Sequence, residues 1–580
     1  MSCTLDVAVP EMSAGVLTYS SDSYIEPGRR VIVEVQKHLH AGFVLGVSLK
    51  KFPRRVKIKP IAGIIDEARI VPDDLWDLAK WSGKICMCGM NYSLRAILPR
   101  KFIEGERVYL HSRTPQKRGK FLEAGNFSPY DPERYEFYRS ELAEGGNALV
   151  LFPSRDDAKS FYASLPEKLK AEALLWPSGS VRLWESWRAV LRGEVRIVIG
   201  PPGGVFAPLS ADKIIVEDEA NPTYIIPYTL KISARSLAGH RAAFLGAEFI
   251  TGGRVPSLKT CLRTHPTQRV KPDRKSIILA DIHASRKEEV NGIDGNIPLT
   301  FSLIRRTYAE IVRGRNVLWI LNRSGESLEV FCEGCGQSVR CGKCGGLMRS
   351  VNDGEVLKCR VCGAVRELPE KCEHCGRKFF KGKRPGIEAL AKIVEAYYPK
   401  VKLYVKGSRK SAMKGLVLST SLGLNILDTL RPGLVAWLDL DAELWGNDYA
   451  TRYRVFTSLY RSIYGGLSVG ESRKVLVQAR RSGMRVAEFL SGGWEKFIAD
   501  ELREREEFML PPYGYMVEVA VKSEKVSRLG LITTLEDAGL FVLDPGEEDK
   551  PFYLNVETLG EASAILEPLS RELEITIRSE

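Results

Sequence analysis

Short apolar segments separated by turns fill the first sixty residues of the chain. They are LDVAVP, GRRVIVEVQ and HAGFVLGVSL, with apolar and polar positions alternating over VIVEV, a dense apolar run in FVLGV, and Gly28 and Gly42 among them. A two-residue period of apolar side chains predicts short strands, because successive side chains of a strand point to opposite faces. We therefore expect a small β-barrel or folded sheet here. The next segment, DDLWDLAKWSGKI, predicts a helix that begins at Asp73 or Asp74.

The pattern changes at about residue 130, where apolar runs alternate with helical segments. Short apolar runs predict strands buried on both faces, and their alternation with helices predicts parallel sheets. The predicted helices are PERYEFYRSELAEGG, RDDAKSFYASLP and KIVEAYYP. The predicted strands are NALVLFPS, RIVIG, KIIVEDEA, AEFITGG and NVLWILN and, after a cysteine-rich segment, KGLVLST, GLVAWLDL and SRKVLVQA. Two α/β lobes of this size indicate a tandem of RecA-like lobes, and the last eighty residues indicate a small α+β domain.

The composition is that of an ordinary globular protein with an excess of positive charge. The chain has 580 residues, of which 44% are hydrophobic and 27% charged, and its net charge is +13. At about 150 residues per domain this length predicts roughly four domains, and the charge points toward a polyanionic partner. The first residues lack the basic and apolar regions of a signal peptide, and no apolar run is long enough to span a membrane. We expect a cytoplasmic protein without a membrane partner.

Basic residues gather on the predicted N-terminal sheet. Between residues 29 and 59 nine lysines and arginines stand against one acid, Glu34. Such a run is often only a solvated face, but small β-modules are common nucleic-acid platforms, so both interpretations stay open. The nine residues are Arg29, Arg30, Lys37, Lys50, Lys51, Arg54, Arg55, Lys57 and Lys59.

Eight cysteines in four Cys-x-x-Cys pairs carry the clearest chemistry in the sequence. A Cys-x-x-Cys turn directs two thiolates at one point, and two such turns complete a tetrahedral Zn²⁺ site. Eight cysteines predict two closed structural sites, with no open position for a catalytic water. A disulfide framework is the alternative, but nothing marks the chain as secreted. The pairs are Cys332/Cys335, Cys341/Cys344, Cys359/Cys362 and Cys372/Cys375, followed by Gly336, Gly345, Gly363 and Gly376, where we expect positive φ angles.

The spacing alone does not decide which pairs share a metal, and we favour a nested arrangement. Fourteen residues separate the two inner pairs, with Asn352-Asp353-Gly354 among them. This stretch predicts a β-hairpin that returns the chain to close the inner site. The inner site would then use Cys341, Cys344, Cys359 and Cys362, and the outer site would use Cys332, Cys335, Cys372 and Cys375.

The order of these parts resembles the PriA (primosomal protein N′) family of bacterial replication-restart proteins. The eight-cysteine segment has that family's spacing, and the phrases HAGFVLGV, GEVRIVIGPPGGVFAP, ILNRSG and FMLPPYG are similar to the family's. The resemblance covers nearly the whole chain and also implies the nested zinc pairing. It implies a domain that binds the 3′ end of a nascent strand, a winged helix, two helicase lobes, zinc motifs and a C-terminal domain.

On this basis we divide the chain into six parts. Residues 1–100 form the 3′-end-binding domain, and residues 101–125 a linker or reduced winged helix, since they are few, polar and basic. The first helicase lobe takes residues 126–325, the two-zinc module 326–380, the second lobe 381–490 and the C-terminal domain 491–580. The fold class expected is therefore α/β, with a small β-rich N-terminal domain and an inserted two-zinc module.

The motor motifs implied by the resemblance are degenerate in this sequence. The segment at the phosphate loop reads GNFSPYDPERY, without the lysine that contacts the phosphates. The Asp-Glu-x-His motif, which would hold Mg²⁺, reads Glu217-Asp218-Glu219-Ala220, and Gly-Ser-Ala-Thr-Pro reads Gly252-Gly253-Arg254-Val255-Pro256. The arginine-finger segment reads SIYGGLSV over 462–469, without arginine. An arginine finger alone can contribute a factor of ~10³ or more, so these losses together predict that ATP is not hydrolysed.

DNA-binding residues are also implied by the resemblance. The family's Phe-Asp-Tyr turn corresponds to Leu17-Thr18-Tyr19, so Tyr19 matches and Thr18 replaces the acid. Gly42 matches a close-approach glycine, and Asp66 matches the second acid of the 3′-end pocket. Phosphate contacts are expected from Arg29, Arg30, Arg54 and Arg55. Structural roles for Tyr19 and Asp66, as a core-edge aromatic and a turn acid, are the alternative. Further contacts are possible at Tyr224, Tyr228, Arg235 and Arg241.

Three functions are compatible with the sequence. The first is a monomeric, cytoplasmic, nucleoid-associated restart scaffold that binds stalled forks, D-loops and single-stranded DNA without unwinding them. Its partners would be primosome and helicase-loading proteins and single-stranded DNA-binding protein. The second is an active ATP-dependent 3′→5′ helicase with an unrecognised nucleotide site. The third is a zinc-ribbon interaction scaffold that does not bind DNA. We favour the first, because the acids and the cysteines persist while the phosphate loop and the arginine finger do not.

Overall fold

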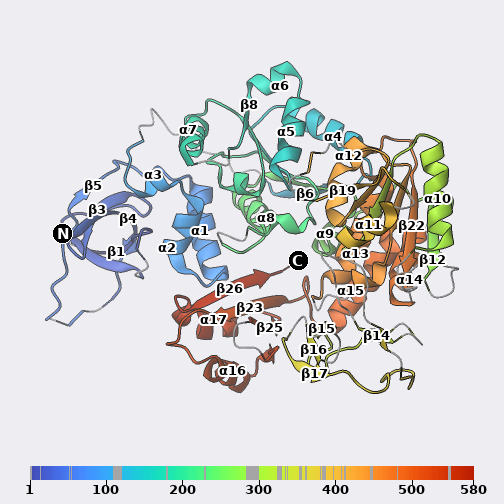
Figure 1. Cartoon of the computed structure of the whole chain (residues 1–580). Coiled ribbons are helices and arrows are strands. Elements are labelled where there is room, and N and C mark those ends of the chain that lie inside the picture. Colours follow the sequence, from blue (N-terminus) through green and yellow to red (C-terminus); the bar gives the residue numbers. More distant parts are fainter. Residues whose placement is uncertain are drawn as a thin grey trace.

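A computed structural model shows the chain folded into four sheet-containing parts and a cysteine-rich insertion (Figure 1). The residues that the structure describes are 3–12, 15–50, 52–53, 55–108, 120–177, 180–226, 230–282, 299–322, 330–332, 335, 337–351, 356–359, 362–378, 380–381, 387–395, 398–405, 408–409, 413–444, 448–479, 481–546 and 550–579. Among them, no helix is both long and apolar enough to cross a membrane.

The N-terminal segment forms the antiparallel sheet that the alternating pattern predicts. Its strand order is β2-β1-β4-β3-β5, and the inward side chains form one apolar cluster. The strands are β1 (Cys3–Ala8), β2 (Leu17–Ser21), β3 (Arg30–Val35), β4 (His38–Val47) and β5 (Gly63–Ile64). Three helices follow, α1 (Asp73–Ile85), α2 (Gly89–Ile97) and α3 (Arg100–Ile103). The helix predicted from DDLWDLAKWSGKI is α1.

A six-stranded parallel sheet forms the first lobe, in the order β6-β11-β10-β7-β9-β8. Its central strands are apolar apart from Lys213 at the start of β10 and are buried on both faces, because helices cover each side of the sheet. The strands are β6 (Leu122–Asn126), β7 (Ala148–Leu151), β8 (Ala173–Leu175), β9 (Ile197–Gly200), β10 (Lys213–Val216) and β11 (Glu248–Gly252). The helices are α4 (Asp131–Ala143), α5 (Arg155–Ala163), α6 (Glu167–Ala171), α7 (Ser180–Leu191) and α8 (Ala234–Leu245).

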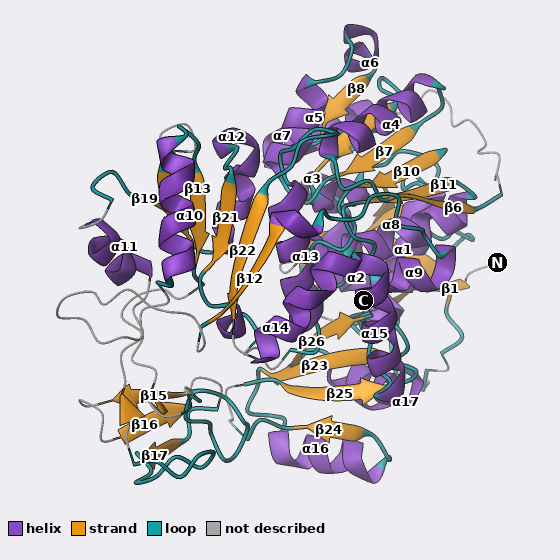
Figure 2. Cartoon of the chain, turned by 90° about the vertical axis from the view of Figure 1, so that its right-hand side faces the viewer, coloured by secondary structure: helices purple, strands orange, loops and turns teal. Residues whose placement is uncertain are grey.

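A second parallel sheet has the order β12-β22-β21-β13-β20-β19, and its strands lie side by side in Figure 2. Its strands are β12 (Ile277–Asp281), β13 (Val317–Ile320), β19 (Lys402–Tyr404), β20 (Leu416–Ser419), β21 (Leu434–Trp437) and β22 (Lys474–Ala479). The helices that follow the first lobe are α9 (Leu258–Thr264), α10 (Phe301–Val312), α11 (Ile387–Glu395), α12 (Leu427–Leu430), α13 (Thr451–Tyr464), α14 (Arg481–Glu488) and α15 (Trp494–Glu507).

Two predicted boundaries are wrong in the light of this topology. We expected the first lobe to extend to residue 325, but β12 and β13 pair with strands of the second sheet. We expected residues 101–125 to be a linker or reduced winged helix, but residues 122–126 are β6, an edge strand of the first sheet. Periodicity identifies strands and does not say which sheet they join. The cysteine-rich segment therefore interrupts the second lobe and does not separate the two lobes.

The cysteine-rich segment contains two small antiparallel sheets. One joins β14 (Phe331–Cys332) to β18 (Phe380–Lys381), at the two ends of the segment. The other has the order β15-β16-β17, formed by Met348–Val351, Val356–Cys359 and Val365–Glu367. Figure 2 shows β15, β16 and β17 set apart from the large sheet. The pairing of β15 with β16 confirms the predicted hairpin, whereas the Asn352-Asp353-Gly354 turn lies outside the described residues.

The C-terminal segment is an α+β unit, as its sequence predicts. Its antiparallel sheet has the order β24-β25-β23-β26, covered by α16 (Arg528–Asp537) and α17 (Gly560–Leu566). The strands are β23 (Tyr515–Val521), β24 (Phe541–Leu543), β25 (Phe552–Val556) and β26 (Leu573–Arg578). Met87, in the turn between α1 and α2, packs into this unit's core. The C-terminal unit therefore contacts the N-terminal part of the chain.

Candidate metal centres and nucleic-acid interface

The eight cysteines form two separate groups of four. Cys332, Cys335, Cys372 and Cys375 form one group, and Cys341, Cys344, Cys359 and Cys362 form the other, with all ligand atoms of a group within 4.8 Å of one another. Within the groups, Sγ–Sγ distances include 3.4 Å for Cys341–Cys362 and 3.5 Å for Cys332–Cys375. Sulfurs bound to one zinc at about 2.3 Å in a tetrahedron are about 3.8 Å apart. The grouping confirms the predicted nested pairing, and both sets fit one metal ion each.

The backbone directly after three of the Cys-x-x-Cys pairs has a conformation that suits metal binding by the cysteines. Gly345, Gly363 and Gly376, each directly after a Cys-x-x-Cys pair, have φ angles of 67°, 66° and 73°. This left-handed conformation turns the chain back, so that backbone N–H groups reach the sulfurs. The Lys343 and Cys362 N–H groups each lie 3.4 Å from a cysteine Sγ. Such donors favour the thiolate form that binds metals.

An ion pair between Arg30 and Asp66 lies inside the N-terminal domain. Arg30 Nε is 2.7 Å from one Asp66 carboxylate oxygen, and Nη2 is 2.8 Å from the other. Arg30 Nη1 donates to the Phe102 carbonyl at 2.5 Å, and the guanidinium stacks on the Phe102 ring. Arg30 is 0% and Asp66 6% exposed. The prediction that Arg30 contacts a phosphate is therefore corrected, because its charge is used to fasten the sheet to α3.

The other predicted DNA residues differ in accessibility. Tyr19 is 4% exposed and its hydroxyl donates to the Glu34 carbonyl at 3.1 Å; burial and the Glu34 charge raise its pKa. A Cβ on Gly42 would lie 2.5 Å from Val7 Cγ1, so this glycine permits close packing of β4 on β1. Arg29 donates to the Asp66 backbone oxygen at 2.8 Å. Tyr19, Gly42 and Arg29 therefore have structural roles within the N-terminal domain. Their contact with DNA stays a prediction.

The described residues between positions 49 and 59 are mostly exposed and offer a different surface. Leu49 is 94% and Val56 49% exposed, and Arg55 and Lys57 are exposed beside them. Lys59 pairs with Glu34 at 2.8 Å. Apolar side chains interleaved with free cations suit a nucleic-acid strand better than a buried arginine does. Arg54, predicted to bind DNA, lies outside the described residues.

The acid expected to bind Mg²⁺ in a motor is bound by an arginine in this chain. Arg134 Nη2 lies 2.5 Å from Glu217 Oε1, and Arg134 Nε lies 3.1 Å from both carboxylate oxygens. The Tyr138 hydroxyl donates to Glu217 Oε2 at 2.7 Å. Arg134 also donates to the Ser128 carbonyl, in the segment aligned with the phosphate loop, at 2.5 Å. This loop therefore directs a carbonyl oxygen inward, where a phosphate loop would present N–H donors.

Two further acids, Glu219 and Asp131, are also paired with arginines. Arg235 Nε binds Glu219 Oε2 at 2.5 Å, and the Ser257 N–H donates to the other Glu219 oxygen at 2.6 Å. Arg254 pairs with Asp131. Mg²⁺ is bound through carboxylate oxygens, and those of Glu217, Glu219 and Asp131 are already paired with arginines, so these three residues as they are arranged do not fit a magnesium–nucleotide complex. Asp218 accepts a hydrogen bond from Asn221 Nδ2 at 2.8 Å.

Three further side chains expected to contact DNA, one aromatic and two basic, are also buried. Tyr224 is 1% exposed, and its hydroxyl donates to the backbone oxygens of Leu151 and Glu217. Arg235 and Arg241 are 2% and 0% exposed, and Arg241 Nη2 pairs with Asp74 Oδ2 of α1 at 2.5 Å. These side chains hold the first lobe together and join it to the N-terminal helices. Tyr228 lies outside the described residues.

The two lobes share one apolar core. Tyr130, Val255 and Leu258 of the first lobe belong to the same buried cluster as the side chains of α13 and α15. The Tyr130 and Tyr464 rings meet edge to face at 5.5 Å, and the Tyr453 hydroxyl donates to the Pro256 carbonyl at 2.8 Å. Motor lobes that respond to nucleotide move relative to one another, whereas this interface is packed.

Sequence reasoning missed one arginine at this interface. Arg461 of α13 directly precedes the segment that we aligned with the arginine finger. Burial, first, and then the nearby Arg254 lower its pKa, while Asp218 and Asp131 oppose this effect. The periodicity of helix α13 could have identified Arg461. It lies four residues after Thr457 and three before Tyr464, so it shares a helix face with Tyr464, which faces the first lobe.

Comparisons with known proteins agree with this architecture. Residues 6–99 match the PriA 3'DNA-binding domain (3'BD) family. The replication restart protein PriA of Bacillus subtilis is 23% identical over 418 residues, and that of Borreliella burgdorferi 21% over 605 residues, which cover 67% and 92% of this chain. The chain is similar to these PriA proteins. The family match covers most of the N-terminal sheet and helices α1 and α2.

The extent of the similarity varies among the PriA proteins. The alignment spans 51% of the Bacillus protein and 48% of the Thermotoga maritima one, about half their length, but 87% of the Borreliella one. Among solved structures, a DEAD box protein from Methanococcus jannaschii aligns over 65% of this chain and 87% of its own, with 8% identity and a TM-score of 0.28. A score of this size carries no argument, and the fold rests on the sheet topology described above.

Proposed function

We propose that this chain is a replication-restart scaffold that binds branched DNA through its N-terminal domain and does not hydrolyse ATP. The observation that carries the proposal is the Arg134–Glu217 pair, together with the match of residues 6–99 to the PriA 3'DNA-binding domain. In this function the chain would bind stalled forks, D-loops and nascent 3′ ends. It would promote primosome assembly and loading of the replicative helicase by partner proteins.

The electrostatics of the degenerate site support the proposed absence of turnover. Phosphoryl transfer needs Mg²⁺ between carboxylates and phosphates, and a cation that stabilises the transition state. Here guanidinium groups neutralise Glu217, Glu219 and Asp131 from within. Binding of Mg²⁺ would have to break buried ion pairs, and separating one such pair costs about 3–5 kcal/mol.

Binding of DNA would begin at the N-terminal domain. The exposed loop at residues 49–59 provides cations and apolar side chains on one edge of a small sheet. The rigid core of that domain, held by Arg30 and Asp66, would keep this loop in place. Selection of the 3′ end by Tyr19 and Asp66 would need their side chains to become accessible on binding.

The two four-cysteine groups would each hold one Zn²⁺. A closed four-thiolate site supplies folding energy and no catalysis. Among the described residues, the segment around the cysteines has only a small apolar cluster. Metal binding would therefore determine the shape of its surface. We propose that this surface is where primosome and loading proteins, or single-stranded DNA-binding protein, dock.

The test combines turnover and binding on one DNA. ATP hydrolysis is measured with and without a model fork that carries a nascent 3′ end, next to binding of the same fork. Tight, salt-dependent binding without turnover is the expected result. Turnover that disappears in Asp218→Asn and Glu219→Gln would establish the helicase alternative, and absence of fork binding would favour the interaction scaffold without DNA.

A further inference from the structure

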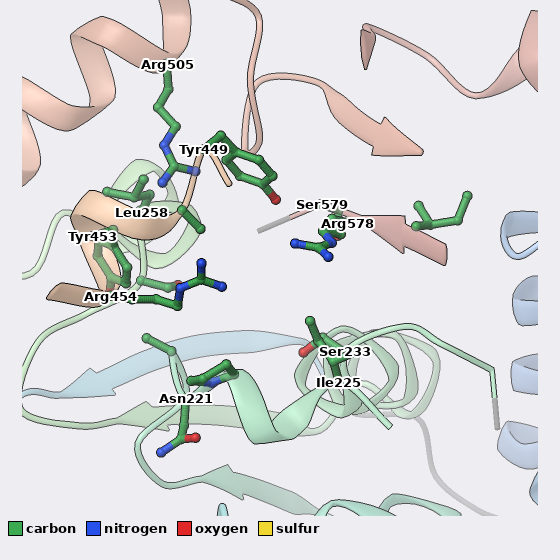
Figure 3. A pocket seen from close by; sticks show the side chains of 15 residues that line it. Asn221, Ile225, Ser233, Leu258, Tyr449, Tyr453, Arg454, Arg505, Arg578 and Ser579 are labelled. Atoms are coloured by element: carbon green, nitrogen blue, oxygen red, sulfur yellow. The ribbon is translucent and has the colours of Figure 1, made fainter. Parts of the chain in front are cut away.

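The arginines around the cavity between the two lobes and the C-terminal domain are paired with acids of the chain (Figure 3). Arg454 and Arg578 each lie 2.9 Å from the same carboxylate oxygen of Asp448. Arg505 lies 3.0 Å from Glu501. The positive charge at this junction is therefore compensated within the chain. Cations without such partners lie elsewhere in the second lobe, on the outer face of helix α10.

Helix α10 exposes a row of large side chains to solvent. Phe301, Tyr308 and Val312 are 51%, 63% and 67% exposed, and Arg305 between them is also exposed. We call these four residues the α10 row. Successive members are 4, 3 and 4 residues apart, so they follow one another along one face of the helix. The outer face of a surface helix is usually polar, and a face with two aromatic rings indicates a contact surface.

The rest of the described chain leaves this face uncovered. Leu303, on the inner side of α10, belongs to the buried cluster on one face of the second sheet. Side chains of α13, α14 and α15 belong to the cluster on the other face of that sheet. In Figure 2 α10 lies in front of the sheet, and none of the described helices or strands is drawn across it.

The charge on and beside the α10 row is positive. Neither Arg305 nor Arg306 forms an ion pair among the described residues, and Arg306 donates only to a serine hydroxyl, at 3.3 Å. Glu310, the one acid of the helix, is 2% exposed, and three half-exposed cations share its carboxylate. They are Arg313, Arg315 and Lys474, at 3.3, 2.5 and 3.5 Å. Because five cations stand against one buried acid, this surface favours a polyanion.

The order of the side chains indicates which polyanion fits. Phe301 and Tyr308 are two helical turns apart, about 10 Å along the axis, with Arg305 between them. Exposed aromatic rings stack on unpaired bases, and neighbouring cations bind the phosphates, which is the combination found on surfaces that bind single strands. The bases of a duplex are already stacked on one another, so a duplex would leave the two rings unused.

We propose that the α10 row is a contact for single-stranded DNA, in which bases stack on Phe301 and Tyr308 and Arg305 binds a phosphate between them. The inference rests on the proposed DNA-binding function and adds a second surface to it. Figure 1 shows the N-terminal domain and α10 on opposite sides of the molecule. One chain would therefore hold a duplex arm of a fork at the N-terminal domain and an unpaired strand at the second lobe.

The first test compares two strands on the full chain. One is a fluorescently labelled oligo-dT, and the other is an abasic strand of the same length, which has the phosphates but no bases. Phe541→Ala is the matched control for Tyr308→Ala, because Phe541 is also 63% exposed and lies on β24 of the C-terminal sheet. We expect Tyr308→Ala to bind oligo-dT roughly tenfold more weakly and the abasic strand as before. Phe541→Ala should change neither affinity.

The second test measures the phosphate contact through the salt dependence of oligo-dT binding. One lost contact lowers the slope of log K against log salt by about 0.7 for a single strand, and we expect this change in Arg305→Gln. Arg485→Gln is the matched control, because Arg485 is exposed on α14, on the other face of the same sheet. Tyr308→Phe keeps the ring and should bind like the unmodified chain. Unchanged thermal unfolding midpoints in these variants exclude misfolding as the cause.

Three results would overturn the proposal. The first is that Tyr308→Ala binds oligo-dT as tightly as Phe541→Ala does. The second is that Tyr308→Ala loses the same affinity for oligo-dT and for the abasic strand, because bases would then not be stacked on the ring. The third is that polyglutamate binds the unmodified chain but not Tyr308→Ala, while both bind oligo-dT equally. The α10 row would then be a site for an acidic protein.

A fork with fully duplex arms separates this inference from the proposed function. Tyr308→Ala should bind that fork as the unmodified chain does, since residues 6–99 lie on the other side of the molecule. If the unmodified chain binds neither the fork nor oligo-dT, the proposed function fails. If it binds the fork alone, or binds both while Tyr308→Ala behaves like Phe541→Ala, only the α10 row is wrong.

Discussion

Arg134 and Glu217, which are 83 residues apart in the sequence, form a buried ion pair at the place where a motor would hold magnesium. Their side chains are 0% and 4% exposed, and Tyr138 completes the hydrogen bonding of the carboxylate. The Arg134 guanidinium, a cation of the chain itself, neutralises the Glu217 carboxylate. The buried Glu217 carboxylate thus has its charge compensated within the lobe.

Removing one partner of this pair should destabilise the chain. In Arg134→Met the Glu217 carboxylate stays buried without its cation, and we expect a loss of about 3–5 kcal/mol in the free energy of unfolding of this lobe. The double variant Arg134→Met, Glu217→Leu should recover most of the loss, because no unpaired charge remains. Denaturant unfolding measures both, with the exposed Arg503→Met as control. A stable Arg134→Met variant that gains magnesium-dependent ATP binding would contradict our interpretation of the site.

The stability of the lobe interface should fall in acid because of Asp131. Burial acts to raise the pKa of Asp131, but Arg254, Arg134 and Arg461 outweigh it and lower the pKa to about 2. A carboxyl whose pKa is depressed in the fold stabilises the protein above its unfolded pKa of about 3.9. This contribution should therefore be complete above pH 5 and disappear as the pH falls from about 4 to 2.

The measurement is the difference in unfolding free energy between the unmodified chain and Asp131→Asn. This difference cancels acid effects elsewhere, including loss of metal from protonated thiols. It should be large at pH 6 and small near pH 2. A difference that does not depend on pH would show that the charge of Asp131 is not what stabilises the interface.

Arg30 and Asp66 should behave as one structural unit. Asp66→Asn and Arg30→Gln should each lower the unfolding free energy of the N-terminal domain by about 3–5 kcal/mol, and the double variant should cost less than their sum. Hydrogen exchange of β3 and β4 would report the local effect. If Asp66→Asn leaves stability unchanged but abolishes preference for a 3′ end, Asp66 is a ligand of the DNA end after all.

The loop at residues 49–59 should carry the salt dependence of fork binding. Replacing Arg55 and Lys57 with glutamine should weaken binding to duplex arms and reduce the slope of log K against log salt by about 0.9 for each lost phosphate contact. Lys168→Gln, at an exposed position on α6, is the control. If Lys168→Gln weakens fork binding and lowers the salt slope by as much, the binding depends on the net charge of the chain and not on this loop.

Metal removal should unfold the cysteine-rich segment and leave the lobes folded. Elemental analysis should find two zinc ions per chain, and Cys341→Ser with Cys344→Ser should leave one, because the outer group is complete without them. Circular dichroism and limited proteolysis would follow the segment. Loss of both ions in this variant would show that the two sites fold as one unit.

The sequence determined the secondary structure and the metal sites. Both are local: the apolar run of HAGFVLGVSL is found in β4, and a Cys-x-x-Cys turn brings its own two thiolates together. The family resemblance was likewise visible in short phrases and in the order of the parts. The loss of the phosphate-loop lysine could be read directly from GNFSPYDPERY.

Only the tertiary structure decided the partners of charged residues and the strands of each sheet. Nothing in the sequence assigns Arg134 to Glu217, Arg30 to Asp66 or Arg241 to Asp74, and from the sequence alone Arg30 and Arg241 are expected to contact DNA. The strand at residues 277–281 lies within the range expected for the first lobe, yet it pairs with β22, nearly 200 residues later. Ion pairs and parallel sheets join distant segments, and their partners depend on how the whole chain packs.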